Sequence, residues 1–239
     1  MEANKPLPIQ TAFNVRELGG YVNIDKQTLK QGHFIRSGGI SELSDEDCAY
    51  LYDYGVRTII DLRSADERAT KPDRLINYKD IKNYAFSLSE DAEPGKMQNL
   101  TISSMDQLYC RILDKSQAMI GEIFKIMLAS KGTVLFHCTA GKDRTGVLAM
   151  LLLKLADVDE ETIINDYAAS YQNLLPYIHR LQKSLEDIHM KLPLHVFESD
   201  PQNMRQTLAY FNQRYTIRGY LTSAGLSEEE IDELRSQLV

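Results

Sequence analysis

One ten-residue stretch, 137–146, constrains this chain more than any other part of its sequence. It reads His-Cys-Thr-Ala-Gly-Lys-Asp-Arg-Thr-Gly, after the apolar run 133–136 and before an apolar stretch from Val147 to Leu155. The pattern predicts a strand, a tight loop and a helix. Five residues separate Cys138 from Arg144. A loop of this length can direct its backbone N–H groups, and the N-terminus of the following helix, at one tetrahedral oxyanion.

Cys138 has the sequence surroundings of a nucleophile. A cysteine attacks as its thiolate, and helix N-termini and nearby cations lower the thiol pKa from about 8.5 to roughly 3.5–7.5. Lys142, Arg144 and the loop amides favour that anion, and the same groups suit a dianionic phosphoryl group. The planar guanidinium of Arg144 can hold two phosphoryl oxygens. We therefore predict attack of the Cys138 thiolate on phosphorus, followed by hydrolysis of a phosphocysteine.

The other loop residues have predicted supporting roles. His137 would orient the loop and help to keep the thiol ionised, and the Thr145 hydroxyl would donate to the sulfur as it leaves in the second step. Gly141 and Gly146 supply backbone freedom and close approach. The predicted phosphate-binding residues are Thr139, Ala140, Gly141, Lys142, Asp143 and Arg144.

Two other interpretations of Cys138 are open. A lone cysteine is often a buried structural residue, and the rhodanese type of sulfur transferase also has a cradle-like loop. Six positions are fixed together here, which by chance occurs about once in 10⁶ chains. The rhodanese loop, moreover, needs no arginine six positions after the cysteine with a hydroxyl residue next to it. Both facts favour phosphoryl transfer.

The loop resembles the H-C-x5-R-[ST] signature of the cysteine-dependent protein tyrosine phosphatase superfamily. It is most similar to the bacterial tyrosine phosphatases that also accept phosphoinositides. The resemblance covers most of the chain, but not about 87–106 or the helices of 171–215. It implies a protein tyrosine phosphatase, with dual-specificity or phosphoinositide phosphatase activity as further possibilities. Similar segments, in the same order, are Asn14-Val15-Arg16-Glu17-Leu18-Gly19-Gly20-Tyr21, Phe34-Ile35-Arg36-Ser37, Ile60-Asp61-Leu62-Arg63-Ser64 and 225–231.

Asp143 is the first candidate for the general acid. Many tyrosine phosphatases carry this acid on a W-P-D loop, but the chain has no tryptophan, and its only Pro-Asp pair, Pro72-Asp73, follows a charged helical stretch. Myotubularin-type lipid phosphatases have an aspartate just before the loop arginine. The resemblance therefore implies that Asp143 protonates the leaving oxygen. The alternative is that Asp143 is only a helix N-cap.

Asp61 is the second candidate. It ends the predicted strand Val56 to Leu62, which should lie parallel to the catalytic strand, so that both carboxyl ends open on one crevice. The alternative is a structural ion pair with Arg63. Lys142 also has two interpretations. It is either a solvated lysine on the loop rim or, as in lipid phosphatases of similar sequence, a residue that faces inositol phosphates in a wide basic site mouth.

Composition and charge narrow the remaining classes. The 239 residues carry a formal net charge of -7 with no basic run, which argues against nucleic-acid binding. Three cysteines, Cys48, Cys110 and Cys138, favour a reducing compartment over a disulfide framework. With no C-x-x-C or histidine cluster, we expect no metal and no cofactor. The expected partners are a phosphorylated protein or a phosphoinositide as substrate, and the oligomeric state is left open.

No signal peptide or membrane span is expected. The N-terminus lacks an apolar h-region, and the longest apolar run, Val147 to Leu153, is far short of the ~20 residues that a span needs. We expect a cytoplasmic protein without stable membrane insertion. A secreted form whose leader has been removed is the alternative. The rival function is a non-catalytic module of the same fold that binds phosphorylated ligands, but such forms usually lack the cysteine, the arginine or the acid.

Strands that alternate with helices predict an α/β fold, with a mainly parallel central sheet flanked by helices as in tyrosine phosphatases. We expect a single phosphatase domain over 1–239, with a helical segment from about 159 to 239. A recurring apolar stripe in that segment is typical of a helix-packing surface. A helical flap over the loop and a face that meets lipid are its alternatives. The stripe is Leu174, Ile178, Leu181, Leu185 and Ile188.

Capping and turn signals predict the individual elements. The expected strands are 32–36, 56–62 and 81–86, and the first can pair with Leu29 in a hairpin. The expected helices are one between a capping box at 44–47 and Gly55, a short one capped by Ser64 and Glu67, and two after about 104. Residues 89–99 are expected to form a loop.

Overall fold

The computed structural model of the chain describes residues 3–88, 104–186 and 197–239. Within these ranges five strands form one sheet in the order β1-β2-β5-β3-β4, in which β1 is antiparallel to β2 and the other neighbours are parallel. The predicted mainly parallel α/β fold is therefore confirmed. The strands are β1 (Arg16–Glu17), β2 (Phe34–Ser37), β3 (Val56–Asp61), β4 (Lys82–Ala85) and β5 (Thr133–His137).

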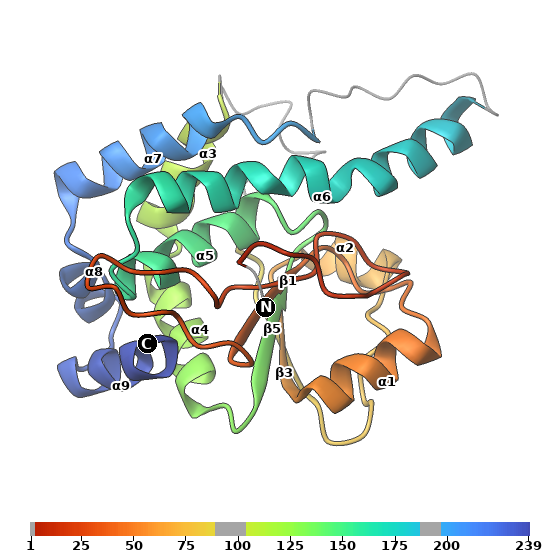
Figure 1. The fold of residues 1–239 in the computed structure, drawn as a ribbon, viewed down its shortest axis with the longest axis horizontal. Coiled ribbons are helices and arrows are strands. Elements are labelled where there is room, and N and C mark those ends of the chain that lie inside the picture. Colours follow the sequence, from red (N-terminus) through yellow and green to blue (C-terminus); the bar gives the residue numbers. More distant parts are fainter. Residues whose placement is uncertain (1–2, 89–103, 187–196) are drawn as a thin grey trace.

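Helices cover both faces of this sheet (Figure 1). α1 and α2 lie on one side of the strands, α3, α4, α5, α8 and α9 lie on the other, and the long α6 runs across α5 with α7 beside it. The helices are α1 (Asp45–Tyr54), α2 (Ala65–Thr70), α3 (Met105–Lys115), α4 (Gln117–Ala129), α5 (Asp143–Leu155), α6 (Glu160–Glu186), α7 (Pro201–Arg214), α8 (Ile217–Ser223) and α9 (Glu228–Leu238).

Alternation along the strands divides the core in two. Val134 and Phe136 of β5 pack into the larger cluster with α3 to α9, whereas Leu135 faces the smaller cluster under α1. Successive strand side chains point to opposite faces, so a sheet covered on both sides needs apolar residues at every position. β5 largely fits this pattern, since its three middle residues are apolar and all five are buried. β5 lies at the centre of the sheet, between β2 and β3.

Three sequence signals for local structure are confirmed. Ser64 and Glu67 form a complete capping box at the start of α2. Gly55 ends α1 in the left-handed conformation, with φ of 112°. Four helices make up most of the described chain after residue 159, and Leu174 and Ile178 of the apolar stripe are buried. Leu185 and Ile188, like the loop expected at 89–99, lie outside the residues whose side chains are described.

Two local predictions are wrong. β2 does not form a hairpin with Leu29: it pairs with β1 and β5, and Leu29 bonds to Tyr21 instead. The capping box of α1 is only half formed. The Ser44 hydroxyl accepts from the Asp47 N–H, but the Asp47 carboxylate turns to the backbone N–H of Thr11 (2.8 Å) and anchors the N-terminal arm. Asp47 therefore bonds to Thr11, which is distant in the sequence, in place of the Ser44 backbone N–H that a capping box requires.

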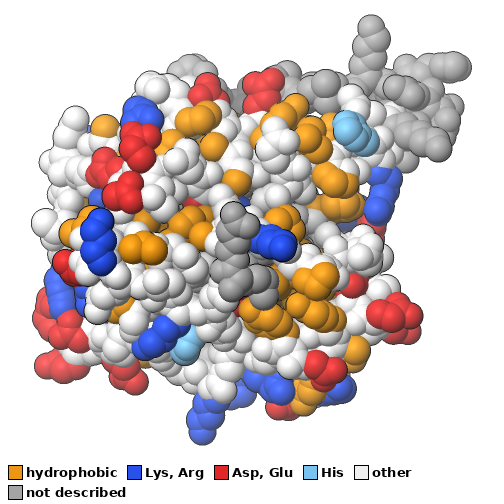
Figure 2. Space-filling model, in the orientation of Figure 1, with side chains coloured by type: hydrophobic (Ala, Val, Ile, Leu, Met, Phe, Trp, Pro, Cys, Tyr) orange, Lys and Arg blue, Asp and Glu red, His pale blue; other side chains and the backbone are white. Residues whose placement is uncertain are grey.

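The surface shows no concentration of positive charge on the face in Figure 2, where Lys and Arg side chains are scattered among Asp and Glu. Within the described residues, no helix has both the length and the apolar character that crossing a membrane requires.

Candidate active site

The ten-residue loop leaves the carboxyl end of β5, beside the ends of its two parallel neighbours. His137 lies in register with Ser37 of β2 and Asp61 of β3. The carboxyl ends of parallel strands therefore converge at the loop, as predicted, and α5 begins at Asp143 directly after it. Gly141 adopts φ of +67°, and a Cβ there would lie 2.4 Å from the Ser37 carbonyl. Only glycine satisfies both conditions.

Two buried side chains hold the loop carbonyls on one side. The Asn14 amide donates to the carbonyls of Ala140 (3.1 Å) and Gly141 (3.0 Å), and the Arg36 guanidinium donates to Gly141 O (2.9 Å). Both residues come from the segments that resemble phosphatases. Because these carbonyls are bound on one side, the loop amides are free to face the other, where an anion would lie.

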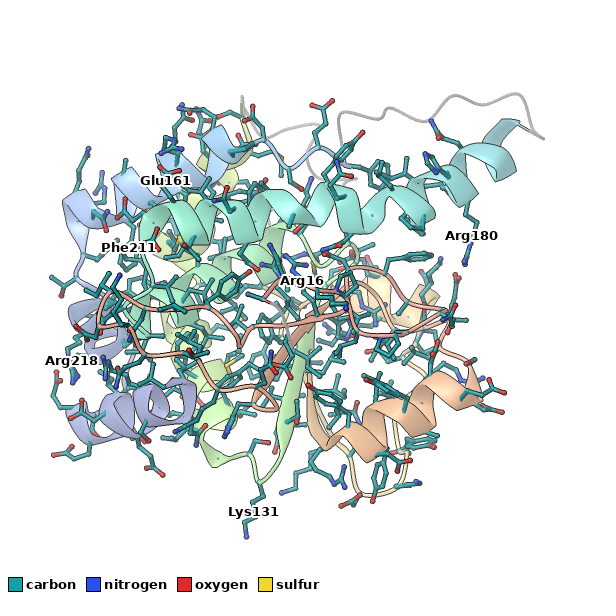
Figure 3. All side chains as sticks on the ribbon, in the orientation of Figure 1. Arg16, Lys131, Glu161, Arg180, Phe211 and Arg218 are labelled. Atoms are coloured by element: carbon teal, nitrogen blue, oxygen red, sulfur yellow. The ribbon has the colours of Figure 1, made fainter. Side chains whose placement is uncertain are left out.

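A buried charge cluster supports these anchors. Arg16 lies in the interior under α6 (Figure 3) and donates to the backbone carbonyl of Asp166 at 2.8 Å. The Asp166 carboxylate forms ion pairs with Arg16 and Arg36 and accepts from the Tyr21 hydroxyl (3.0 Å). Burial opposes ionisation of Asp166, but the two arginines hold its pKa below the ordinary value. Two arginines against one aspartate leave a net positive charge behind the phosphate-facing loop.

Cys138 lies at the base of the loop and is 2% exposed. Burial alone raises the pKa of its thiol, but the charge of Arg144 and the hydroxyl and backbone N–H of Thr145 outweigh burial, so that the pKa lies below its ordinary value. The Thr145 hydroxyl is buried and makes no hydrogen bond to nitrogen or oxygen among the described residues. Its nearness to Cys138 helps to lower the thiol pKa, and its donation to the departing sulfur stays a prediction.

His137 ties the base of the loop to a neighbouring aspartate. Its Nε2 lies 3.0 Å from Asp73 Oδ2 and its Nδ1 lies 3.2 Å from the carbonyl oxygen of Cys138. Burial lowers the pKa of His137, but the contact with Asp73 reverses the direction and raises it. The side chain therefore orients the backbone at Cys138 and does not contact the substrate side directly.

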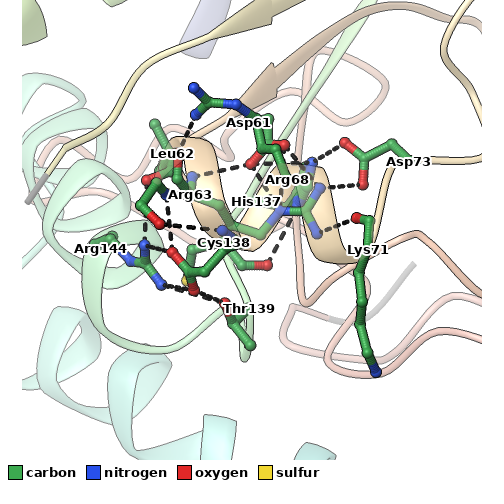
Figure 4. A network of polar contacts seen from close by, with 12 residues as sticks. Asp61, Leu62, Arg63, Arg68, Lys71, Asp73, His137, Cys138, Thr139 and Arg144 are labelled. Carbon is green, nitrogen blue, oxygen red and sulfur yellow. Dashed lines mark hydrogen bonds and ion pairs between the residues drawn. The ribbon is translucent and has the colours of Figure 1, made fainter. Parts of the chain in front are cut away.

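The Arg144 guanidinium is engaged by a carboxylate that the sequence did not assign to the site. Its two terminal nitrogens lie 2.6 and 2.9 Å from the oxygens of Glu67, and one of them also donates to the Thr139 hydroxyl at 3.2 Å (Figure 4). Burial raises the pKa of Glu67, but Arg144 and Thr139 lower it overall to about 2. Glu67 therefore holds the guanidinium in this structure, and the predicted contact of Arg144 with phosphoryl oxygens stays a prediction.

Asp61 forms the ion pair that was its alternative interpretation. Both of its oxygens accept from Arg63, at 2.8–3.2 Å, and Arg63 also binds Asp73 at 2.6 Å. Burial opposes its ionisation, but Arg63 and His137 keep the pKa of Asp61 lowered. Donor atoms of Asp61, Asp73 and His137 lie within 4.8 Å of one another, as a metal site requires. The Arg63 guanidinium already bonds to both carboxylates there and supplies the balancing positive charge.

Asp143 is the first residue of α5 but does not cap it. The N-cap is Lys142, and no side-chain hydrogen bond caps this helix. The Asp143 carboxylate instead accepts a short hydrogen bond from the Tyr109 hydroxyl of α3, and its side chain keeps 24% exposure. The cap interpretation is therefore wrong, and Asp143 is a partly accessible carboxylate beside the loop.

Lys142 turns into the protein. It is 2% exposed, its ammonium donates to the Glu198 carbonyl (3.0 Å) and it lies 3.5 Å from Asp143 Oδ1. The solvated rim lysine is therefore wrong. Among the described residues Lys142 links the loop to the segment before α7.

A small cleft adjoins the loop at Thr139. Leu174 and Tyr177 of α6 form one wall, Phe13 packs on Tyr177 with ring centroids 5.0 Å apart, and Lys71 lies at the rim. α6 therefore borders the site with apolar side chains. Whether it moves as a flap stays a prediction.

Comparisons with known proteins show the family of this chain. The sequence profile of the tyrosine phosphatase family matches residues 7–239, so the chain belongs to that family. A tyrosine-protein phosphatase of Nostoc commune is 34% identical over 223 residues, which cover 86% of this chain and 74% of that protein. The triple specificity protein phosphatase PtpB of Mycobacterium tuberculosis is 26% identical over 277 residues, covering 94% and 99%. Pseudomonas aeruginosa TpbA, a solved structure, aligns with a TM-score of 0.43 at 16% identity over 81% of this chain and 86% of that one.

Sequence reasoning missed several residues at the site, and the signals for them differ. Glu67 was visible as a capping residue, but nothing showed that its carboxylate would also reach Arg144. Asn14 and Arg36 lay in segments that resemble the family, without an assigned role. Tyr109 and Tyr167 left no signal, because a buried aromatic residue in a helix is most often only a core residue.

Proposed function

We propose that the chain hydrolyses phosphomonoesters, chiefly phosphotyrosine in proteins, through a phosphocysteine on Cys138. The observation that carries this proposal is the thiol of lowered pKa inside a loop whose carbonyls are bound by Asn14 and Arg36 on the opposite side. These features favour both the nucleophile and the oxyanion it attacks. Family membership supports the same chemistry.

In the first step the Cys138 sulfur bonds to phosphorus and the bond from phosphorus to the leaving oxygen breaks. Asp143 gives its proton to that oxygen, so the leaving group departs neutral. The loop amides and Arg144 hold the phosphoryl oxygens. This requires Arg144 to turn part of its fork from Glu67 to the substrate.

In the second step a water molecule attacks phosphorus and the bond to sulfur breaks. Asp143, now ionised, takes a proton from this water, and Thr145 donates to the departing thiolate. Inorganic phosphate is released and the enzyme returns to its first state. No step needs a metal or a redox partner.

We also propose a reducing, cytoplasmic setting and a single domain over 1–239. The three free cysteines support the first proposal, and the family match over 7–239 supports the second. Phosphoinositides are a further candidate substrate because the loop resembles that of bacterial tyrosine phosphatases that also accept them. One relative is named a triple specificity phosphatase. The buried position of Lys142 gives this candidate no added support, and its role toward such ligands stays a prediction.

The test is hydrolysis of phosphotyrosyl peptides and of a phosphoinositide panel, in EDTA, by the wild type and by Cys138→Ser. We expect turnover by the wild type only, while the serine variant still binds the phosphate ester, because a hydroxyl is not ionised near neutral pH. Substantial hydrolysis by the serine variant contradicts the covalent mechanism. Binding without turnover by the wild type indicates the rival, a non-catalytic module.

A further inference from the structure

The Asp143 carboxylate has two unequal oxygens. The Tyr109 hydroxyl donates to Oδ1, and the Lys142 ammonium lies 3.5 Å from the same atom. Oδ2 accepts no hydrogen bond from any residue that the structure describes. One oxygen is therefore fixed by the protein, while the other is left to carry a proton.

The hydroxyl that fixes Oδ1 is itself held in place. Tyr109 of α3 and Tyr167 of α6 are fully buried, their hydroxyls lie 2.7 Å apart, and their rings pack edge to face with centroids 5.8 Å apart. The Tyr167 ring also packs against the loop, because a Cβ on Gly146 would lie 3.3 Å from it. Two helices thus position one hydroxyl pair against the end of the loop.

The direction of the hydrogen bonds follows from the chemistry. Burial, and then the charge of Asp143, raise the pKa of Tyr109 well above its ordinary value, so the phenol stays protonated and donates. Its single hydrogen goes to Asp143, so Tyr167 is the donor between the two hydroxyls. The chain of donors runs from Tyr167 to Tyr109 to Asp143 Oδ1.

We infer that Tyr109, supported by Tyr167, is a positioning residue that holds the general acid Asp143 with Oδ2 toward the leaving oxygen. This inference rests on the proposed function. When Asp143 gives up its Oδ2 proton, the new carboxylate is stabilised by the hydrogen bond that Tyr109 already donates to Oδ1. The hydroxyl pair moves no proton to the substrate.

The hydrogen bond also sets the pH range of the acid. A donor to a carboxylate favours its ionised form. Without the Tyr109 hydroxyl, the basic limb of the rate profile, which reports the protonated acid, should therefore move to higher pH. The titratable and charged groups that face Asp143 are Tyr109 from α3, Tyr167 from α6, and Lys142, Arg144 and Cys138 from the loop.

The test compares Tyr109→Phe and Tyr167→Phe with Tyr220→Phe. The control tyrosine is equally buried and donates to the Leu113 carbonyl (2.7 Å), away from the loop. With phenyl phosphate, a poor leaving group, we expect Tyr109→Phe to lose roughly 10-fold in rate, a part of the 10²–10⁴ that a positioned acid contributes. With dinitrophenyl phosphate, which needs no proton, it should stay within about 2-fold of wild type. Tyr167→Phe should show a smaller loss of the same kind.

A further measurement separates positioning from damage to the fold. The basic limb of the rate profile should move to higher pH in Tyr109→Phe but not in Tyr220→Phe. Equal slowing of both substrates, or an unmoved limb, overturns the inference. Asp143→Asn serves as the reference. If Asp143→Asn slows hydrolysis of phenyl phosphate far more than that of dinitrophenyl phosphate while Tyr109→Phe does not, the positioning role of Tyr109 is wrong and the proposed function stands.

Discussion

Carboxylates on the two sides of the ten-residue loop 137–146 are bound in different ways. On the side of β3 and α2, Asp61 and Glu67 have both oxygens bound by arginine. On the side of α3 and α6, the contacts that hold Asp143 fall on one oxygen, where the Tyr109 hydroxyl donates and the Lys142 ammonium lies 3.5 Å away. A carboxylate whose two oxygens are both bound by a guanidinium stays ionised and cannot deliver a proton near neutral pH. This difference favours Asp143 over Asp61 as the proposed acid.

Arg144→Lys should give the largest effect, because it removes the group that connects the β3–α2 flank to the substrate. Lysine keeps the charge but cannot bind two phosphoryl oxygens and Glu67 in one plane. We expect kcat/KM for a phosphotyrosyl peptide to fall by about 10²–10³. Arg205→Lys, on an exposed arginine of α7 paired with Glu161, is the matched control and should retain full activity. If kcat/KM of Arg144→Lys stays within a few-fold of the wild-type value, Arg144 binds Glu67 and not the substrate.

Asp143→Asn tests whether the general acid lies on the α3–α6 flank of the loop. An asparagine cannot donate a proton, so hydrolysis of phosphotyrosine should fall by about 10² or more, with a much smaller loss for dinitrophenyl phosphate. The basic limb of the rate profile should disappear as well. If both substrates slow alike, the acid lies elsewhere and Asp61 returns as the candidate.

Asp61→Asn should show the opposite pattern, with a loss of stability and no leaving-group signature. The substitution removes charged hydrogen bonds to Arg63, which keeps Asp73 as a partner. We expect the free energy of unfolding to drop by about 1.5–3 kcal/mol, measured by urea titration. Activity per folded molecule should fall equally for the two leaving groups. A selective loss with the poor leaving group contradicts the structural assignment of Asp61.

The sequence predicted the loop and the sheet better than it predicted the contacts around them. The apolar runs of β3, β5 and α5 are local patterns that predict the strand, loop and helix. The partner of β2 and the contacts of Asp47 depend on residues far along the chain, and no local signal specifies them. The same limit explains the site. Cys138 and Arg144 followed from spacing, but the grip of Glu67 on Arg144 joins residues 77 apart in sequence.

The smallest expected effect tests the pairing of Glu67 through pH. Its pKa falls from the ordinary 4.5 to about 2 in the folded protein. A lowered folded-state pKa means that the stabilisation is present above about pH 4.5 and is lost as the pH falls towards 2. Glu67→Gln should therefore be less stable than wild type by roughly 0.5–1.5 kcal/mol at pH 7, since the pair is partly exposed to solvent. The difference should shrink between pH 4.5 and 2.

On an Arg144→Ala background the Glu67→Gln substitution should have almost no pH-dependent effect on stability, because the partner of Glu67 is gone. If the difference in free energy of unfolding between Glu67→Gln and its parent stays constant with pH on both the wild-type and the Arg144→Ala backgrounds, the loss comes from the capping hydrogen bond with Ser64. The ion pair of Glu67 with Arg144 then contributes little to stability.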